Sequence, residues 1–110
     1  MKKLIAATLL ACCAGAVYAH PPAKIEAKFS GDQLDITITH NVKDAAKHFI
    51  DDIIVKFNGQ ELAVQKCLRQ TDNDTQLAVY RIAGLKKGDK LSVTAKCNKS
   101  GEKTVEVSVP

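Results

Sequence analysis

Residues 24–40 read KIEAKFSGDQLDITITH, in which apolar and polar side chains alternate with a period of two. The alternation breaks at Ser30-Gly31-Asp32, a combination typical of a turn, and then resumes. Because strict alternation places the apolar side chains on one face of an extended chain, this stretch predicts two half-buried strands joined by a tight turn.

The rest of the chain repeats this pattern. The apolar run 53–57 leads into Asn58-Gly59, the strongest short signal for a β-hairpin. The polar run 70–76 predicts a loop, and helical structure is expected only as a turn around residues 44–47. Further runs predict strands at 62–64, 77–82, 91–97 and 105–109. Seven short strands separated by turns predict an all-β fold, an immunoglobulin-like antiparallel β-sandwich.

The composition limits the classes of protein to consider. The chain has 110 residues, of which 45% are hydrophobic and 25% charged. These values are typical of one small globular domain, and they exclude intrinsic disorder, collagen-like repeats and a polytopic membrane protein.

Residues 1–19 have the pattern of a secretory signal peptide. Two lysines precede an apolar stretch too short to span a bilayer, and Val17-Tyr18-Ala19 offers small residues for cleavage. Cleavage leaves 20–110 as an exported, periplasmic domain without a transmembrane span. It also removes Lys2 and Lys3 from the formal charge of +4, so nucleic acid binding has little support. An alternative interpretation reads residues 9–12, LLAC, as a lipobox, which makes the protein a lipoprotein anchored at Cys12.

Residues that can bind a metal gather at one end of the predicted sandwich. His40 continues the inward parity of its strand, His48 precedes the next strand, and Cys97 ends a later strand with inward parity. Antiparallel pairing brings these strand ends together with the start of the first strand, next to His20. Three imidazoles and a thiolate suit iron, copper or zinc, and they do not suit calcium or magnesium.

Two segments carry a resemblance to a known family: residues 39–59, THNVKDAAKHFIDDIIVKFNG, and residues 93–101, VTAKCNKSG, with HPP at 20–22. They resemble the iron-binding domain of superoxide reductases, the desulfoferrodoxin and neelaredoxin group. The resemblance implies one ferrous ion held by four histidines and an axial cysteine, with a sixth position open to superoxide. The residues that match metal ligands of the family are His20, His40, His48 and Cys97.

The chain also departs from the family pattern. The family's C-N-x-H-G turn ends here in Ser100-Gly101, so one histidine ligand is missing. If cleavage makes His20 the first residue, its α-amino group could replace that ligand. The acidic and lysine residues that usually precede the family's first histidine have no counterpart after cleavage. Lys43 and Lys47 are the candidates for attracting superoxide in their place.

The resemblance implies an oxidoreductase that reduces superoxide to hydrogen peroxide. It implies a separate electron-donor protein, because the chain lacks a rubredoxin-like module with four cysteines. Two alternatives stay open. One is a periplasmic metal carrier, most readily for copper, that binds without turnover. The other is a binding module without metal, in which a disulfide joins Cys67 and Cys97.

Overall fold

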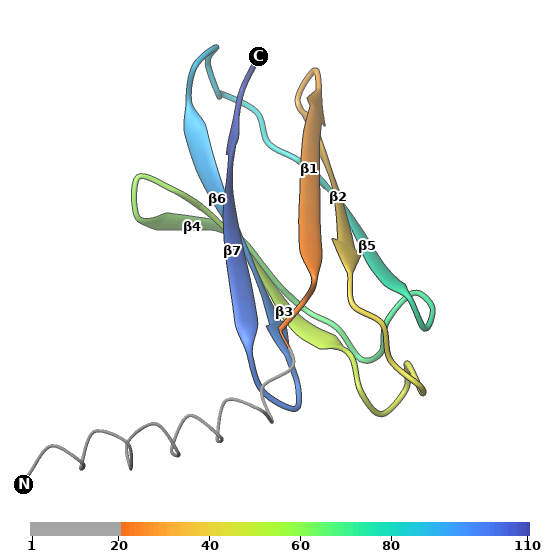
Figure 1. Cartoon of the computed structure of the whole chain (residues 1–110). Helices are drawn as coiled ribbons and strands as arrows, with labels where there is room; N and C mark the ends of the chain where they lie inside the picture. Colours follow the sequence, from red (N-terminus) through yellow and green to blue (C-terminus); the bar gives the residue numbers. More distant parts are fainter. Residues whose placement is uncertain (1–20) are drawn as a thin grey trace, which may run out of the picture.

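A computed structural model describes residues 21–110 of the chain, so the expected signal peptide, Cys12 and His20 lie outside the described residues. The described part contains seven strands and no helix (Figure 1). The strands are β1 (Lys24–Ser30), β2 (Gln33–Thr39), β3 (Ile50–Phe57), β4 (Gln60–Lys66), β5 (Thr75–Arg81), β6 (Lys90–Cys97) and β7 (Glu102–Ser108). Within residues 21–110, nothing helical is long and apolar enough to cross a membrane.

The strands form two sheets in which every pair is antiparallel. One sheet has the order β1-β2-β5 and the other the order β4-β3-β6-β7. Figure 1 shows the two sheets side by side, with β1 and β2 facing β6 and β7. The predicted seven-stranded, all-β architecture is therefore confirmed, and the immunoglobulin-like label stays a prediction.

The core lies between the sheets and follows the period-two pattern. Every second side chain of β2 is buried, and so is every second side chain of β6. Burying one large aliphatic side chain stabilises the fold by about 1.5–3 kcal/mol, so this layer contributes most of the driving force. The least exposed members of the core are Leu34, Ile36, Ile38, Ile50, Ile53, Val55, Leu91, Val93 and Ala95.

The β3–β4 hairpin has the predicted turn. Asn58 has φ of 53° and Gly59 has φ of 79°, so both residues adopt the left-handed conformation that a tight two-residue hairpin of this hand requires. Several boundaries differ from the prediction: β4 is longer than 62–64, β7 begins three residues before 105, and the starts of β3 and β5 also shift. β3 begins at Ile50, three residues before the run 53–57, so Asp51 and Asp52 belong to the strand. β5 begins at Thr75, because the alternation extends two residues into the polar run.

Antiparallel register brings four strand ends together. Lys24 at the start of β1 pairs with Thr39 at the end of β2, and Ile50 at the start of β3 pairs with Cys97 at the end of β6. The 40–49 connection and the β6–β7 turn both lie at this end, at the bottom of Figure 1. The predicted helical turn is a single turn, in which the N–H groups of Lys47 and His48 donate to the Asp44 carbonyl.

Candidate metal centre

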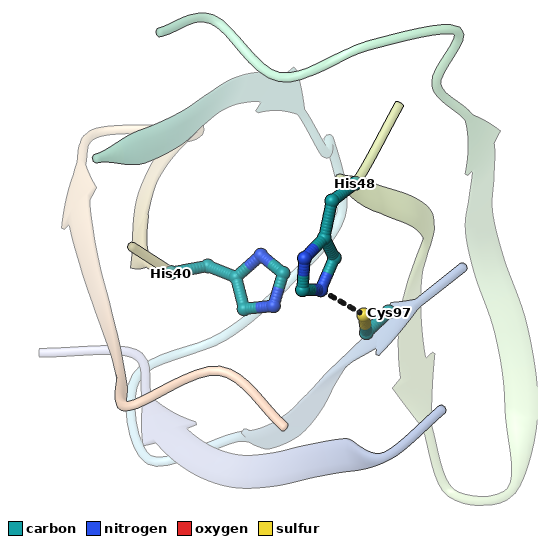
Figure 2. Close-up of side chains that lie close together, drawn as sticks. All are labelled: His40, His48 and Cys97. Carbon is teal, nitrogen blue, oxygen red and sulfur yellow. Dashed lines mark hydrogen bonds between the residues drawn. The ribbon is translucent and has the colours of Figure 1, made fainter. Parts of the chain in front are cut away.

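Three of the four predicted ligands meet at this end of the sandwich. His40 follows β2, His48 precedes β3, and Cys97 ends β6. One ligand atom from each lies within 4.8 Å of the others (Figure 2). His40 is 1% exposed and Cys97 is 7% exposed, so the site is set into the end of the core. We call these three residues the His/Cys cluster.

The separation between His48 and Cys97 suits two ligands of a single ion. The Nε2 atom of His48 is 3.2 Å from the Sγ atom of Cys97. Metal–nitrogen bonds of about 2.0–2.1 Å and a metal–sulfur bond of about 2.3 Å would place two ligands at right angles roughly 3.1 Å apart. The rings of His40 and His48 stand edge to face, with centroids 5.0 Å apart and an interplanar angle of 85°. Two nitrogens and one sulfur are donors that iron, copper and zinc accept.

The turn after β6 is attached to the segment that carries His48. The Asn98 N–H donates to the Phe49 carbonyl at 2.9 Å, and the Phe49 N–H donates to Oδ1 of Asn98 at 2.9 Å. Nδ2 of Asn98 also donates to the Lys47 carbonyl at 3.0 Å. Both neighbours of His48 are therefore hydrogen-bonded to the residue that follows Cys97.

The sulfur of Cys97 has a backbone donor as well. The Lys99 N–H points at Sγ with a separation of 3.3 Å. The turn closes when the Cys97 N–H donates to the Gly101 carbonyl at 2.9 Å. Ser100, which the resemblance aligns with the family's last histidine, is exposed in this turn.

Pro21, the first residue that the structure describes, packs against the turn that follows Cys97. Gly101 has φ of +95°, and a Cβ atom built on it would lie 2.6 Å from the backbone nitrogen of Pro21. Only glycine fits at this position, for both conformational and steric reasons. Pro22 is buried, and the Ala23 N–H donates to the Thr39 carbonyl at 2.8 Å. The first strand is therefore entered directly beside the His/Cys cluster, and His20 is the residue bonded to Pro21.

Of the two candidate lysines, one lines a hollow next to the cluster. This hollow has a volume of about 520 Å³, and its lining includes His48 and Lys43. Lys47 is exposed but does not line the hollow. Among residues 21–110, the hollow is lined by Asn41, Val42, Lys43, Asp44 and His48.

A buried glutamine beside His40 was missed by the sequence analysis. Gln70 lies in the polar run that predicted a loop, yet it is 1% exposed. Its side chain is hydrogen-bonded to the ring of His40 and to the backbone of three residues, namely His40, Ile50 and Asp72. No alternation of apolar side chains marks this position, so the sequence pattern carries no signal for it.

The disulfide alternative is not realised, because Cys67 and Cys97 are both free thiols. The Cys67 N–H donates to the Asp51 carbonyl, whereas Cys97 pairs with Ile50 from the other side of β3. Since neighbouring strands are about 4.8 Å apart, the two cysteines are separated by roughly twice that spacing. A disulfide requires Cα atoms within about 7 Å of each other. Burial raises the pKa of the Cys67 thiol, and the carboxylates of Asp51 and Asp52 raise it further.

Comparison with known proteins identifies the fold. The superoxide reductase (1Fe-SOR) from Giardia intestinalis matches with a TM-score of 0.64 and 24% identity, over 81% of this chain and 99% of that chain. A superoxide reductase in the oxidized state matches with a TM-score of 0.52 and 18% identity, over 83% of this chain and 88% of that one. A variant of the superoxide reductase (neelaredoxin) from Ignicoccus hospitalis matches with a TM-score of 0.51 and 21% identity, over 88% and 86%.

No protein-family model matches the chain, and no curated protein matches it either. The similarity to superoxide reductases is therefore one of three-dimensional structure, and it extends over most of the chain. It confirms, at the level of the fold, the resemblance that residues 39–59 and 93–101 indicate.

Proposed function

We propose that this protein is an exported iron protein that reduces superoxide to hydrogen peroxide. The observation that carries the proposal is the meeting of His40, His48 and Cys97 within 4.8 Å. This cluster lies in a sandwich with the fold of superoxide reductases. His20 completes the proposed ligand set.

The donor set fits a mononuclear iron site. Imidazole nitrogen and thiolate sulfur are both iron ligands, and a buried thiolate at a strand end is a fixed donor. The N–H of Lys99 offers the sulfur a second interaction, and hydrogen bonds to a ligand sulfur tune the properties of a bound metal. The Asn98 hydrogen bonds hold the chain on both sides of His48, so that ring is presented to the sulfur in one orientation.

The position of Pro21 supports His20 as the fourth ligand. Pro21 packs against Gly101 in the turn that follows Cys97, and His20 is one covalent bond away from it. Cleavage before His20 would also provide a terminal amine with a pKa of about 7.7–8.0, which can bind metal near neutral pH. We propose that this amine replaces the imidazole that Ser100 does not supply.

Lys43 is the proposed attractant for the substrate. Superoxide is a small anion, and the hollow beside His48 is open to solvent. A cation on the wall of such a hollow raises the local concentration of an anion. Lys43 is favoured over Lys47 because it lines the hollow.

The reaction balances with one electron and two protons per superoxide. Bound iron would supply the electron, passing from the ferrous to the ferric state, and solvent would supply the protons. A separate electron-donor protein would return the iron to the ferrous state. The chain's own residues bind the ion, attract the anion and hold the sulfur in place.

The experiment is to isolate the chain from cells without added metal and to measure its N-terminus, bound metal and superoxide consumption. We expect a chain that begins at His20 with one iron, and one hydrogen peroxide per superoxide consumed. Cys97→Ser should abolish iron–sulfur absorption and turnover, whereas Cys67→Ser, the matched control across β3, should retain both. Bound copper without turnover would favour a metal carrier over a superoxide reductase. Absence of any bound metal would overturn both functions.

A further inference from the structure

The side chain of Gln70 uses its whole hydrogen-bonding capacity at the His/Cys cluster. Its Nε2 atom donates to the carbonyls of His40 and Asp72, each at 3.0 Å. Its Oε1 atom lies 2.5 Å from Nδ1 of His40 and 3.2 Å from the N–H of Ile50. An amide has two N–H donors and two lone pairs, so no capacity is left unused.

These partners fix which way the amide faces. The two groups next to Nε2 are backbone carbonyls, which only accept hydrogen bonds. The Ile50 N–H only donates, so it requires the oxygen. Rotating the amide by 180° would set its NH₂ group against that N–H and its oxygen against two carbonyls. The orientation of Gln70 is therefore determined by the backbone and not by the histidine.

The orientation of the amide in turn determines the state of the imidazole. Because Oε1 is an acceptor, Nδ1 of His40 must carry the proton and donate. In a neutral ring the lone pair is then on Nε2. Figure 2 shows Nε2 of His40 turned toward the side on which His48 and Cys97 lie. The lone pair therefore faces the other two members of the cluster.

We infer that Gln70 is a positioning residue, which locks His40 as the tautomer protonated at Nδ1 and thereby assigns Nε2 as its metal-binding nitrogen. This inference rests on the proposed function for its metal, but the tautomer itself is a property of the metal-free chain. The main-chain link from the Gln70 N–H to the Ala45 carbonyl, at 3.0 Å, anchors the loop independently of the side chain. Loop anchoring and tautomer selection can therefore be separated by substitution.

The test compares three variants of the 20–110 chain with the unchanged protein. Gln70→Met removes the acceptor at nearly constant volume. Gln70→Glu keeps an acceptor for His40 and Ile50 but sets an oxygen against the two carbonyls that Nε2 bonds, so it should retain the tautomer while folding less stably, which urea denaturation measures. Gln76→Met is the matched control, because Gln76 is also buried, at 6% exposure, and its Nε2 donates to the Leu77 carbonyl.

The first readout is the ¹⁵N NMR spectrum of the histidine rings in metal-free protein, at a pH where free imidazole is neutral. We expect His40 to be protonated at Nδ1 in the unchanged chain, in Gln70→Glu and in Gln76→Met, and to be a mixture of tautomers in Gln70→Met. The second readout is the dissociation constant for Co²⁺ as a probe ion. Loss of an outer partner of a ligand histidine typically weakens metal binding by about 10–100-fold, and we expect this for Gln70→Met only.

Protonation at Nε2 of His40 in the unchanged chain would overturn the inference, and this result does not depend on any variant folding. So would a folded Gln70→Met protein with unchanged tautomer and unchanged Co²⁺ affinity. If the tautomers behave as expected while no protein binds Co²⁺ or iron, the proposed function fails and the role of Gln70 stands.

Discussion

Asn98 and Phe49 are joined by two hydrogen bonds, one from each N–H, across the end of the sandwich. The pairing connects the residue after one cluster member, Cys97, to the residue after another, His48. This pairing of Asn98 with Phe49 lies directly beside the contact between Nε2 of His48 and Sγ of Cys97, which are 3.2 Å apart.

Asn98→Ala should destabilise the fold and weaken metal binding together. It removes the side-chain bonds to Phe49 and Lys47, which at about 0.5–1.5 kcal/mol each amounts to roughly 1–3 kcal/mol. Urea denaturation and Co²⁺ titration measure the two effects. Asn98→Asp, which keeps the acceptor for the Phe49 N–H, should lie between Asn98→Ala and the unchanged protein. Equal Co²⁺ affinity in all three would show that the side-chain hydrogen bonds of Asn98 do not position His48.

Gly101→Ala should displace the N-terminal segment. The new methyl group would overlap Pro21, and the residue would also adopt an unfavourable φ. Gly88→Ala is the matched control, because Gly88 has φ of +91° with no atom within 4 Å of the added Cβ. Both variants should lose about 1–2 kcal/mol of stability, because an alanine is strained at positive φ. If His20 is a ligand, only Gly101→Ala should also lose metal affinity, and equal affinities would remove His20 from the site.

Lys43→Gln should lower the second-order rate constant for superoxide several-fold and reduce its dependence on ionic strength. Steering by a charge near a binding hollow has this signature. Lys47→Gln is the control of equal charge change, and we expect its rate constant to stay close to that of the unchanged protein. Pulse radiolysis at two salt concentrations measures both quantities. A larger effect at Lys47 would reverse the assignment.

Tyr80 should make the fold less stable above pH 10. Burial, with a smaller contribution from the charge of Cys67, raises the pKa of Tyr80 to about 12, whereas an unfolded tyrosine ionises near 10. Between these values the unfolded chain loses its proton first, so stability present below pH 10 is lost as the pH rises toward 12. Urea denaturation of Tyr80→Phe, compared with the unchanged protein across this range, isolates the effect. Parallel pH curves for the two proteins would contradict it.

Much of the fold could be predicted because the period-two pattern is local. The alternation within each strand predicts which of its faces is buried. Antiparallel pairing of the strands then places His40, His48 and Cys97 at the same end. The Asn58-Gly59 turn is equally local, because its conformation depends on two residues.

The features that sequence missed depend on contacts between distant segments. Gln70 is buried because its loop folds under the 40–49 connection, and nothing in its immediate sequence distinguishes it from its exposed neighbours. The separation of Cys67 from Cys97 follows from the order of strands within a sheet, which alternation does not encode. Likewise, Lys43 and Lys47 occur in the same loop, and only its three-dimensional path places one of them in the hollow.

The order β4-β3-β6 has a consequence for the chemistry of sulfur in this chain. β3 lies between the two thiols, so an internal bond between them would require breaking the ladder of hydrogen bonds on both sides of a central strand. The cooperativity of the sheet therefore opposes formation of a disulfide between Cys67 and Cys97 in the folded domain. Among residues 21–110, the width of one strand keeps the sulfur of Cys97 apart from the other thiol, Cys67.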